Sequence, residues 1–231
     1  MKRLVPLLVA LLALPVCAQA ITYLGLGIDR SGSITPADFA LQINAYANAL
    51  GDASVLPQDG SVAIGVWSFG STVVEHFAPT VITAGNVGSL VAAVNGITQF
   101  SAGATALGPV IEAMQVSLLG AAGAGDRTVM DISTDGGGNI GINQVTASNN
   151  AIAAGIDQIN GLGVGGAANL NFVNGAGSFA IQVDSFADFE VALERKIIRE
   201  TRPRVPDSGS TAMILIGGLV GLVALRRRFA A

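Results

Sequence analysis

Oxygen-bearing side chains gather at three places in the chain, each at a junction between a predicted strand and a predicted helix. They are Asp29, Ser31 and Ser33 after one apolar run, Thr105 before an amphipathic stretch, and Asp135 after another apolar run. Carboxylate and hydroxyl oxygens suit Mg²⁺, with Mn²⁺ and Ca²⁺ as alternatives, whereas zinc prefers the histidine and cysteine that these clusters lack. Magnesium keeps some of its waters, so hydroxyls can bind it directly while aspartates hold its waters. The pattern predicts a Mg²⁺ site with one position open for an acidic group of a partner.

Each cluster taken singly has a simpler explanation. Serine, threonine and aspartate often cap helices or close turns through their own side chains. Three such clusters in this order, all at predicted strand ends or helix starts, favour a shared metal site over unrelated turns.

The hydrophobic pattern predicts the elements that must position these side chains. Apolar runs predict strands at residues 23–28, 62–69, 72–77, 128–132, 156–164 and 179–183, and helical periodicity predicts helices at 36–50, 107–118, 147–154 and after 185. Strands that alternate with helices indicate an α/β, doubly wound and mostly parallel sheet. The second and third runs flank a short glycine turn, which predicts a hairpin and one antiparallel edge strand. Ligands of such sheets bind at the carboxyl ends of the strands.

At these residues the chain resembles the von Willebrand factor type A fold and its metal-ion-dependent adhesion site, the D-x-S-x-S, Thr, Asp pattern also used by integrin inserted domains. It is most similar to a bacterial von Willebrand A-like family of unassigned function. Further matching segments are Phe39-Ala40-Leu41-Gln42, Val66-Trp67-Ser68, Ala106-Leu107-Gly108 and Phe186-Ala187-Asp188-Phe189. The resemblance runs from about residue 23 to residue 200. It implies a Rossmann-type fold and a metal held by Asp29, Ser31, Ser33, Thr105 and Asp135.

Other catalytic or cofactor sites have weaker support. The glycine-rich stretch 161–166 fits a dinucleotide fingerprint by spacing, but no helical pattern follows to receive a pyrophosphate. His76 is the only histidine, in a predicted strand where we expect it to face solvent, and no G-x-S-x-G turn is present. A metal-assisted hydrolase would need a base besides the predicted ligands. We therefore expect a protein that is not an enzyme.

Charge argues against nucleic acid as a partner. Residues 21–204 form one domain-sized block that carries fifteen acidic and seven basic side chains, a net charge near −8. A surface of this sign repels phosphate backbones.

The N-terminus has the pattern of a secretory signal peptide over residues 1–20. A basic start at Lys2 and Arg3 precedes an apolar stretch at 4–16, and small residues lead up to a cleavage site after Ala20. Cleavage there removes Cys17, the only cysteine, so the mature chain would contain neither disulfides nor a thiol nucleophile.

The C-terminus, residues 205–231, carries a second processed segment. It consists of the motif Val205, Pro206, Asp207, Ser208 and Gly209, an apolar helix at 211–225 and a basic stop at 226–228. The order resembles a PEP-CTERM sorting signal in its VPDSG variant, which implies an exosortase-like sorting enzyme and a membrane-inserted C-terminal helix before processing. An ordinary single-span anchor is the alternative. Arginines after the helix should stay cytoplasmic, which places the domain outside.

Together these features predict an exported module in the cell envelope, then at the cell surface or in the extracellular matrix. We expect it to bind a protein partner that presents an acidic side chain to the Mg²⁺ site. The alternative is a structural matrix or surface protein without metal-dependent binding.

Overall fold

The structure is a computed structural model that describes residues 20–99 and 103–202. The chain divides into two compact units, Met1–Thr201 and Arg202–Ala231, and the description below concerns the first. The predicted signal peptide up to residue 19 and the predicted sorting signal, including its transmembrane helix at 211–225, lie outside the described residues. No helix within the described ranges is long and apolar enough to cross a membrane.

One mixed sheet forms the centre of the domain, with strands in the order β3-β2-β1-β4-β5 and both β6 and β7 beside β5. The strands are β1 (Thr22–Asp29), β2 (Asp59–Phe69), β3 (Val73–Thr83), β4 (Arg127–Thr134), β5 (Gln158–Val164), β6 (Asn174–Gly175) and β7 (Ala180–Val183). Only β3 and β6 run antiparallel to their neighbours. The predicted mostly parallel sheet with an antiparallel edge strand, β3, is confirmed. The sequence did not predict β6, whose two residues are too few to show a periodic pattern.

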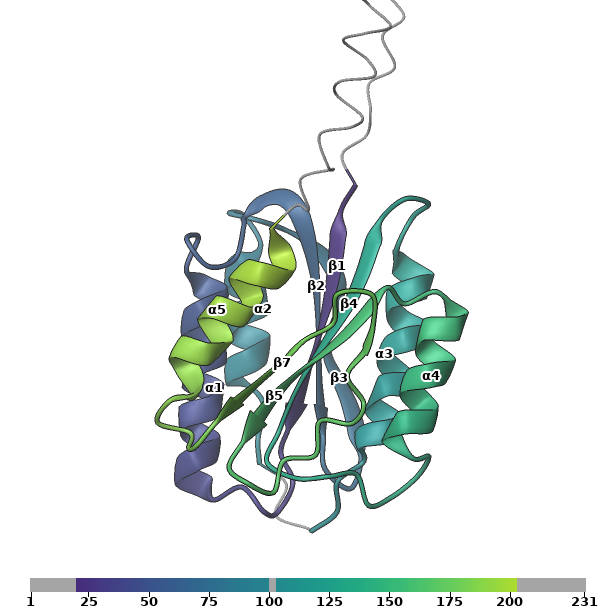
Figure 1. The fold of residues 1–231 in the computed structure, drawn as a ribbon. Coiled ribbons are helices and arrows are strands. Elements are labelled where there is room, and N and C mark those ends of the chain that lie inside the picture. The colour runs from purple at the N-terminus through teal and green to yellow at the C-terminus, as the bar shows by residue number, and fades with distance from the viewer. Residues whose placement is uncertain (1–19, 100–102, 203–231) are drawn as a thin grey trace, which may run out of the picture. The chain divides into compact units, whose positions relative to one another are not determined.

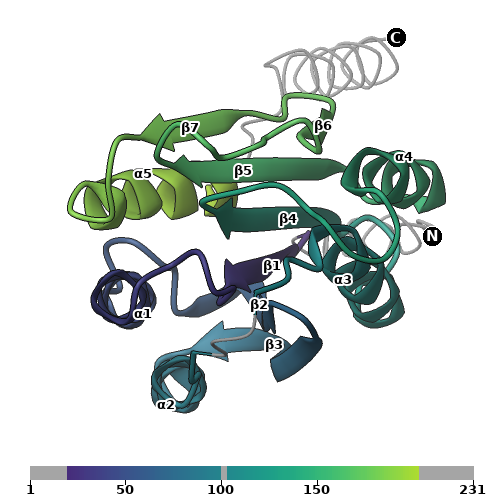
Figure 2. The same ribbon diagram turned by 90° about the horizontal axis from the view of Figure 1, so that it is seen from below.

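Helices cover both faces of the sheet, as Figures 1 and 2 show. They are α1 (Pro36–Gly51), α2 (Val87–Asn95), α3 (Leu107–Ala121), α4 (Gln144–Ala154) and α5 (Phe189–Thr201). α1, α2 and α5 lie on one face, and α3 and α4 pack together on the other. α2 was not predicted, because only Leu90 and Val94 of its nine residues are buried and no side chain caps its start.

Each face of the sheet has its own hydrophobic core. Leu24, Leu26 and Ile28 of β1 point into the core under α1 and α5, while α3 and α4 enclose the other core. Glycines in β1 allow α3 to come close: a methyl group added at Gly25 would lie 2.9 Å from the Cε of Met114. Thus α3 is held against β1, which fixes the helix start that follows Thr105 relative to the end of β1.

The helix α1 begins where its sequence predicts. The Thr35 hydroxyl accepts a hydrogen bond from the Asp38 backbone N–H at 3.2 Å, and Pro36 occupies the first turn, where its missing N–H costs nothing. Phe39, Ile43 and Tyr46 then face the core. The loop between Asp29 and Thr35 is consequently short and fixed at both ends.

A buried charge cluster joins α5 to the middle of the sheet. Lys196 Nζ lies 2.6 Å from Asp131 Oδ1 and 2.5 Å from Glu200 Oε1, and all three side chains are fully buried. Asn160 Nδ2 also donates to Glu200, at 2.7 Å. Burial raises the pKa of Glu200 to about 8, with the Asp131 charge adding to the rise and Lys196 opposing it. The raised pKa favours the protonated form of Glu200, and the ammonium of Lys196 also lies within ion-pair distance of Asp131.

Candidate metal centre

The register of the sheet brings the predicted site residues together. β1 and β4 are parallel neighbours, and Ile28 pairs with Ser133. The loops that follow these strands therefore leave the same edge of the sheet side by side. One loop carries Asp29, Ser31 and Ser33, and the other carries Asp135.

Hydrogen bonds connect four of the five predicted ligands in one chain. The Ser31 N–H donates to Asp29 Oδ1 at 2.8 Å, the Ser31 and Ser33 hydroxyl oxygens are 3.1 Å apart, and the Ser33 hydroxyl donates to Asp135 Oδ1 at 2.8 Å. Two hydroxyls that lie this close, with a carboxylate at each end, form a concentrated set of hard oxygen donors.

Thr105 lies on the adjoining loop and is almost fully buried. Its N–H donates to Asn139 Oδ1 at 2.8 Å, and the Asn139 N–H donates to the Thr105 carbonyl at 3.0 Å. The next N–H, of Ala106, donates to the Gly70 carbonyl at 2.8 Å. These bonds hold Thr105 against the loop that carries Asp135. No contact within the described residues joins its side chain directly to the other four.

Asp29 is a buried carboxylate for which the described part of the chain offers no salt-bridge partner. Its side chain is fully buried, and Oδ2 accepts a 2.7 Å hydrogen bond from the Thr134 hydroxyl. Burial raises the pKa of Asp29 to about 6; hydrogen bonds from Ser31 and Thr134 oppose the rise, and the Asp135 charge adds to it. Lys196 forms the salt bridges found in the described part of the chain, and none involves Asp29. A bound cation would supply the missing positive charge.

The neighbouring arginine points away from this carboxylate. Arg30 Nη1 donates to the Thr98 carbonyl at 3.4 Å and Nη2 to the Thr72 hydroxyl at 3.3 Å. The guanidinium therefore stabilises the loops beside the site, and no salt bridge among the described residues joins it to Asp29.

The donor set excludes a site made of charged ligands alone. Within residues 20–99 and 103–202, no group of three or more His, Cys, Asp or Glu side chains could hold a metal ion. A cation held at this edge by side chains would therefore use hydroxyl oxygens beside the two aspartates. That is the mixed set that the sequence predicts for Mg²⁺.

Polar side chains of α1 and β4 support the site from behind. The sequence analysis did not predict this role for them. Gln42 Nε2 donates to the Asp29 carbonyl at 2.7 Å, and the Tyr46 hydroxyl donates to the Ser133 hydroxyl at 3.0 Å. Gln42 is a polar residue inside the buried face of α1, which is a signal that sequence reading could have used. Thr134, directly before the predicted ligand Asp135, was given no role by the sequence analysis. Nothing local to Asn139 indicates its contact with Thr105.

His76, which the sequence predicted to face solvent, is only partly exposed and contacts a buried residue of β2. This side chain is half-buried, and its Nε2 lies 2.7 Å from the Ser68 hydroxyl. Ser68 is fully buried in β2 and needs a hydrogen-bond partner, which draws the imidazole inward. Burial lowers the His76 pKa, and the Arg30 charge adds to this effect. No described carboxylate orients the ring, so the pair lacks the third member of a catalytic triad.

The glycine-rich stretch 161–166 belongs mainly to the sheet. Its first four residues are the last four of β5, and turns rather than a helix follow it. There is consequently no helix N-terminus after it that could receive a pyrophosphate.

Comparison with known protein families identifies the family of this chain. The family described as "Protein of unknown function (DUF1194)" matches residues 19–205. The chain belongs to the DUF1194 family. The VPDSG-CTERM motif matches residues 204–229, which confirms the predicted sorting motif at the C-terminus of this DUF1194 protein. No curated protein matches the sequence.

Solved structures confirm the von Willebrand A-like fold. Proximal thread matrix protein 1 from the mussel byssus aligns with a TM-score of 0.67 at 16% identity, over 79% of this chain and 48% of that one. A von Willebrand factor type A protein from Catenulispora acidiphila aligns with a TM-score of 0.63 at 14% identity, over 79% and 43%. The pilus adhesin SpaC from Lactobacillus rhamnosus GG aligns with a TM-score of 0.62 at 14% identity, over 79% and 30%. The DUF1194 protein thus spans about half the length of the mussel protein.

Proposed function

We propose that this DUF1194 protein is an exported, non-catalytic binding module that uses a divalent cation, Mg²⁺ in the first place, to bind a protein partner. The observation that carries the proposal is the fully buried carboxylate of Asp29, which has no cationic partner among the described residues and lies beside two converging serine hydroxyls. Burying a charge without compensation is costly, and a metal ion would remove that cost.

The donor set suggests how the partner binds. The Ser31, Ser33 and Thr105 hydroxyls are neutral ligands, so they leave most of the charge of the ion unquenched. The two aspartates would hold its waters and orient the hydroxyls. A carboxylate of the partner would then complete the octahedral shell that Mg²⁺ prefers. A proximal thread matrix protein structure with a zinc-occupied MIDAS motif, aligned here with a TM-score of 0.67 at 16% identity, supports a divalent cation in this fold.

The position of the site suits a displayed binding surface. The ends of the described domain meet at the opposite edge of the sheet: the Arg127 N–H donates to the Ile21 carbonyl at 2.9 Å, and Arg127 Nη1 donates to the Glu200 carbonyl at 2.7 Å. Figure 1 shows β1 beginning and α5 ending at that edge. The candidate site therefore lies at the edge of the sheet opposite the two ends of the described domain.

The sorting motif supports a location at the cell surface or in the extracellular matrix. An exosortase-like enzyme would read the VPDSG motif, and the C-terminal helix would hold the chain in the membrane until then. The adhesin SpaC has the same fold, which supports a role in adhesion. A structural role without metal-dependent binding is the second candidate, supported by the similarity to a byssus matrix protein.

A metal-dependent pull-down tests the proposal. Full-length protein in detergent is incubated with the extracellular fraction of the cells that make it, in Mg²⁺ or in chelator. Bound proteins are then identified by mass spectrometry. We expect a partner that is retained in Mg²⁺ and lost both in chelator and with Thr105→Ala. Thr146→Ala, at an exposed position on α4, serves as the matched control. Equal retention in chelator and with Thr105→Ala would favour the structural role instead.

A further inference from the structure

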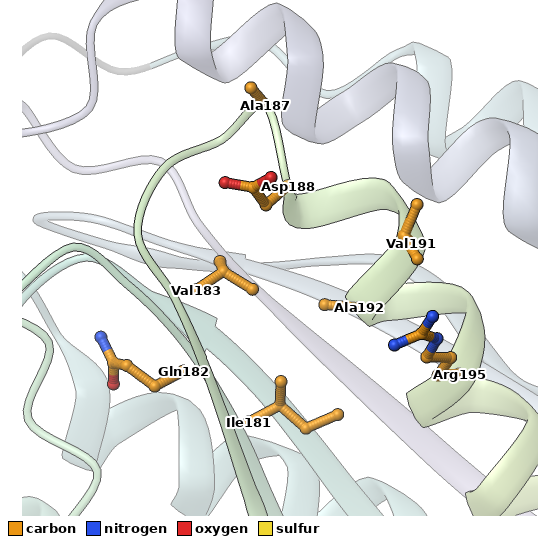
Figure 3. A pocket seen from close by; sticks show the side chains of 8 residues that line it. All are labelled: Ile181, Gln182, Val183, Ala187, Asp188, Val191, Ala192 and Arg195. Carbon is orange, nitrogen blue, oxygen red and sulfur yellow. The ribbon is translucent and has the colours of Figure 1, made fainter.

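A groove runs between the edge strand β7 and the outer side of α5. Its volume is about 430 Å³. Ile181 and Val183 of β7 form its floor, and Val191 and Ala192 of α5 form its wall (Figure 3). Asp188, in the turn just before α5, lies toward one end of the groove, and Arg195 of α5 lies toward the other. The groove is apolar at its centre and oppositely charged at its two ends.

The strand that borders the groove is an open edge. β7 pairs with β5 on one side, and no described strand pairs with its other side. Its exposed residues, Ala180 and Gln182, carry no charge. The opposite edge strand, β3, is protected by Glu75, Pro79 and irregular pairing with β2. β7 has none of these devices, so its free N–H and C=O groups can pair with another chain.

The exposed face of α5 along the groove has a symmetric charge pattern. Val191 and Arg195 are four residues apart on one side of α5, and Asp188, in the turn just before the helix, lies three residues before Val191 along the same groove. Val191 is 52% exposed, and no described ion pair involves Arg195. The apolar residue thus lies at the midpoint of a segment whose two ends carry opposite charges.

From this arrangement we infer that the β7–α5 face binds a second copy of the same chain through a two-fold axis that passes near Val191. Such an axis sets the two α5 helices antiparallel. Asp188 of each copy then faces Arg195 of the other, and the two Val191 side chains meet at the centre. The same axis pairs the two β7 edges in antiparallel fashion, which continues the sheet from one copy into the other.

The two-fold axis also sets the directions in which the two α5 helices end. In each copy α5 ends at the edge of the sheet opposite the candidate metal site (Figure 1). An antiparallel pair therefore sends its two C-terminal ends in opposite directions. This arrangement fits copies on two facing surfaces, or processed copies in a matrix.

Charge exchange tests the pairing. Asp188→Arg or Arg195→Asp places like charges opposite each other twice per dimer, and each should weaken self-association by about tenfold or more. The double variant, with both changes, restores opposite charges and should recover wild-type association. The measurement is sedimentation velocity of the full chain in detergent over a range of concentrations, with circular dichroism to confirm folding.

Thiol crosslinking locates the axis. The chain has one cysteine, Cys17, in the predicted signal peptide, so Val191→Cys adds the only thiol of the domain. Mild oxidation should link two copies through this position. Val116→Cys is the control, because Val116 is 72% exposed on α3, on the other face of the sheet, and should stay unlinked.

The candidate metal ligands are not part of the β7–α5 face. The dimer should therefore be equally populated in Mg²⁺ and in chelator, so its test does not depend on whether the proposed metal-dependent binding is correct. A protein that is monomeric at all concentrations would overturn the inferred dimer. Self-association that neither single charge reversal weakens would also overturn it, because the contacts would then lie elsewhere. Equal crosslinking at positions 116 and 191 would also overturn it.

Discussion

Replacing Asp29 by asparagine should make the metal-free protein more stable. The substitution keeps the shape of the side chain and its acceptor for the Ser31 N–H. The new amide donor faces the Thr134 hydroxyl, which can instead donate to the Gly136 carbonyl at 3.3 Å. What is lost is the buried negative charge that no described cation balances.

The size of the effect follows from the pKa of Asp29. Burial raises it from 3.8 to about 6, so the ionised carboxylate costs the folded state about 3 kcal/mol at pH 7.5. Because the pKa is raised in the folded state, the wild type has its full stability below pH 3.8. It loses stability as the pH rises from there toward about 6. The advantage of Asp29→Asn should be up to about 3 kcal/mol at pH 7.5 and below about 1 kcal/mol at pH 4.

Urea unfolding in chelator and in Mg²⁺, at both pH values, measures this effect. Magnesium should stabilise the wild type by about 2.7 kcal/mol at a concentration one hundred times its dissociation constant, and should leave Asp29→Asn unchanged. The reasoning is refuted if the variant is the less stable protein in chelator at pH 7.5, or if it responds to Mg²⁺ as the wild type does.

Three further predictions concern other parts of the chain. Lys196→Met should destabilise the fold by about 3 kcal/mol or more in urea unfolding, because it leaves Asp131 buried and unpaired; an unchanged midpoint would contradict the described cluster. Glu200→Gln should match the wild type near pH 4 and be the more stable protein at pH 7, because only the wild type has a carboxyl that ionises in the unfolded state while the fold holds it protonated. The raised Glu200 pKa makes the wild type lose stability as the pH rises from 4.5 to about 8, and the Gln variant should lack this slope. Mass spectrometry of the native protein should show a mature chain that begins at Ile21 and lacks residues 212–231, and an intact Ala231 would exclude processing of the tail.

The sequence predicted most of the fold because hydrophobic periodicity was strong where the elements are long. The stripe of Leu107, Val110, Ile111, Met114 and Leu118 predicted α3, and all five residues are buried. The start of α4 was placed three residues too late, since Asn143, which caps the helix by accepting from the Val145 N–H at 2.9 Å, was not recognised. α2 and β6 were missed because each is short and has few buried residues.

The candidate site was predictable in its residue types but not in its contacts. Asp29, Ser31 and Ser33 lie on one short loop, so their proximity follows from spacing alone. The bond from Ser33 to Asp135 joins residues 102 positions apart, and only the pairing of β1 with β4 brings them together. The buried Lys196 cluster was missed for the same reason, since Asp131 lies inside an apolar strand and its partners are on α5.

A crystal of the protein soaked in Mn²⁺ tests the central claim most directly. Manganese takes oxygen ligands like those of magnesium and scatters anomalously, so its position can be seen without assuming the site. We expect one strong anomalous peak within bonding distance of the Ser31, Ser33 and Thr105 hydroxyl oxygens, and no such peak in an Asp29→Asn crystal. An ordered Ser31–Ser33 loop without a peak in the wild type, or a peak bound only elsewhere, would contradict a metal centre at this edge of the sheet.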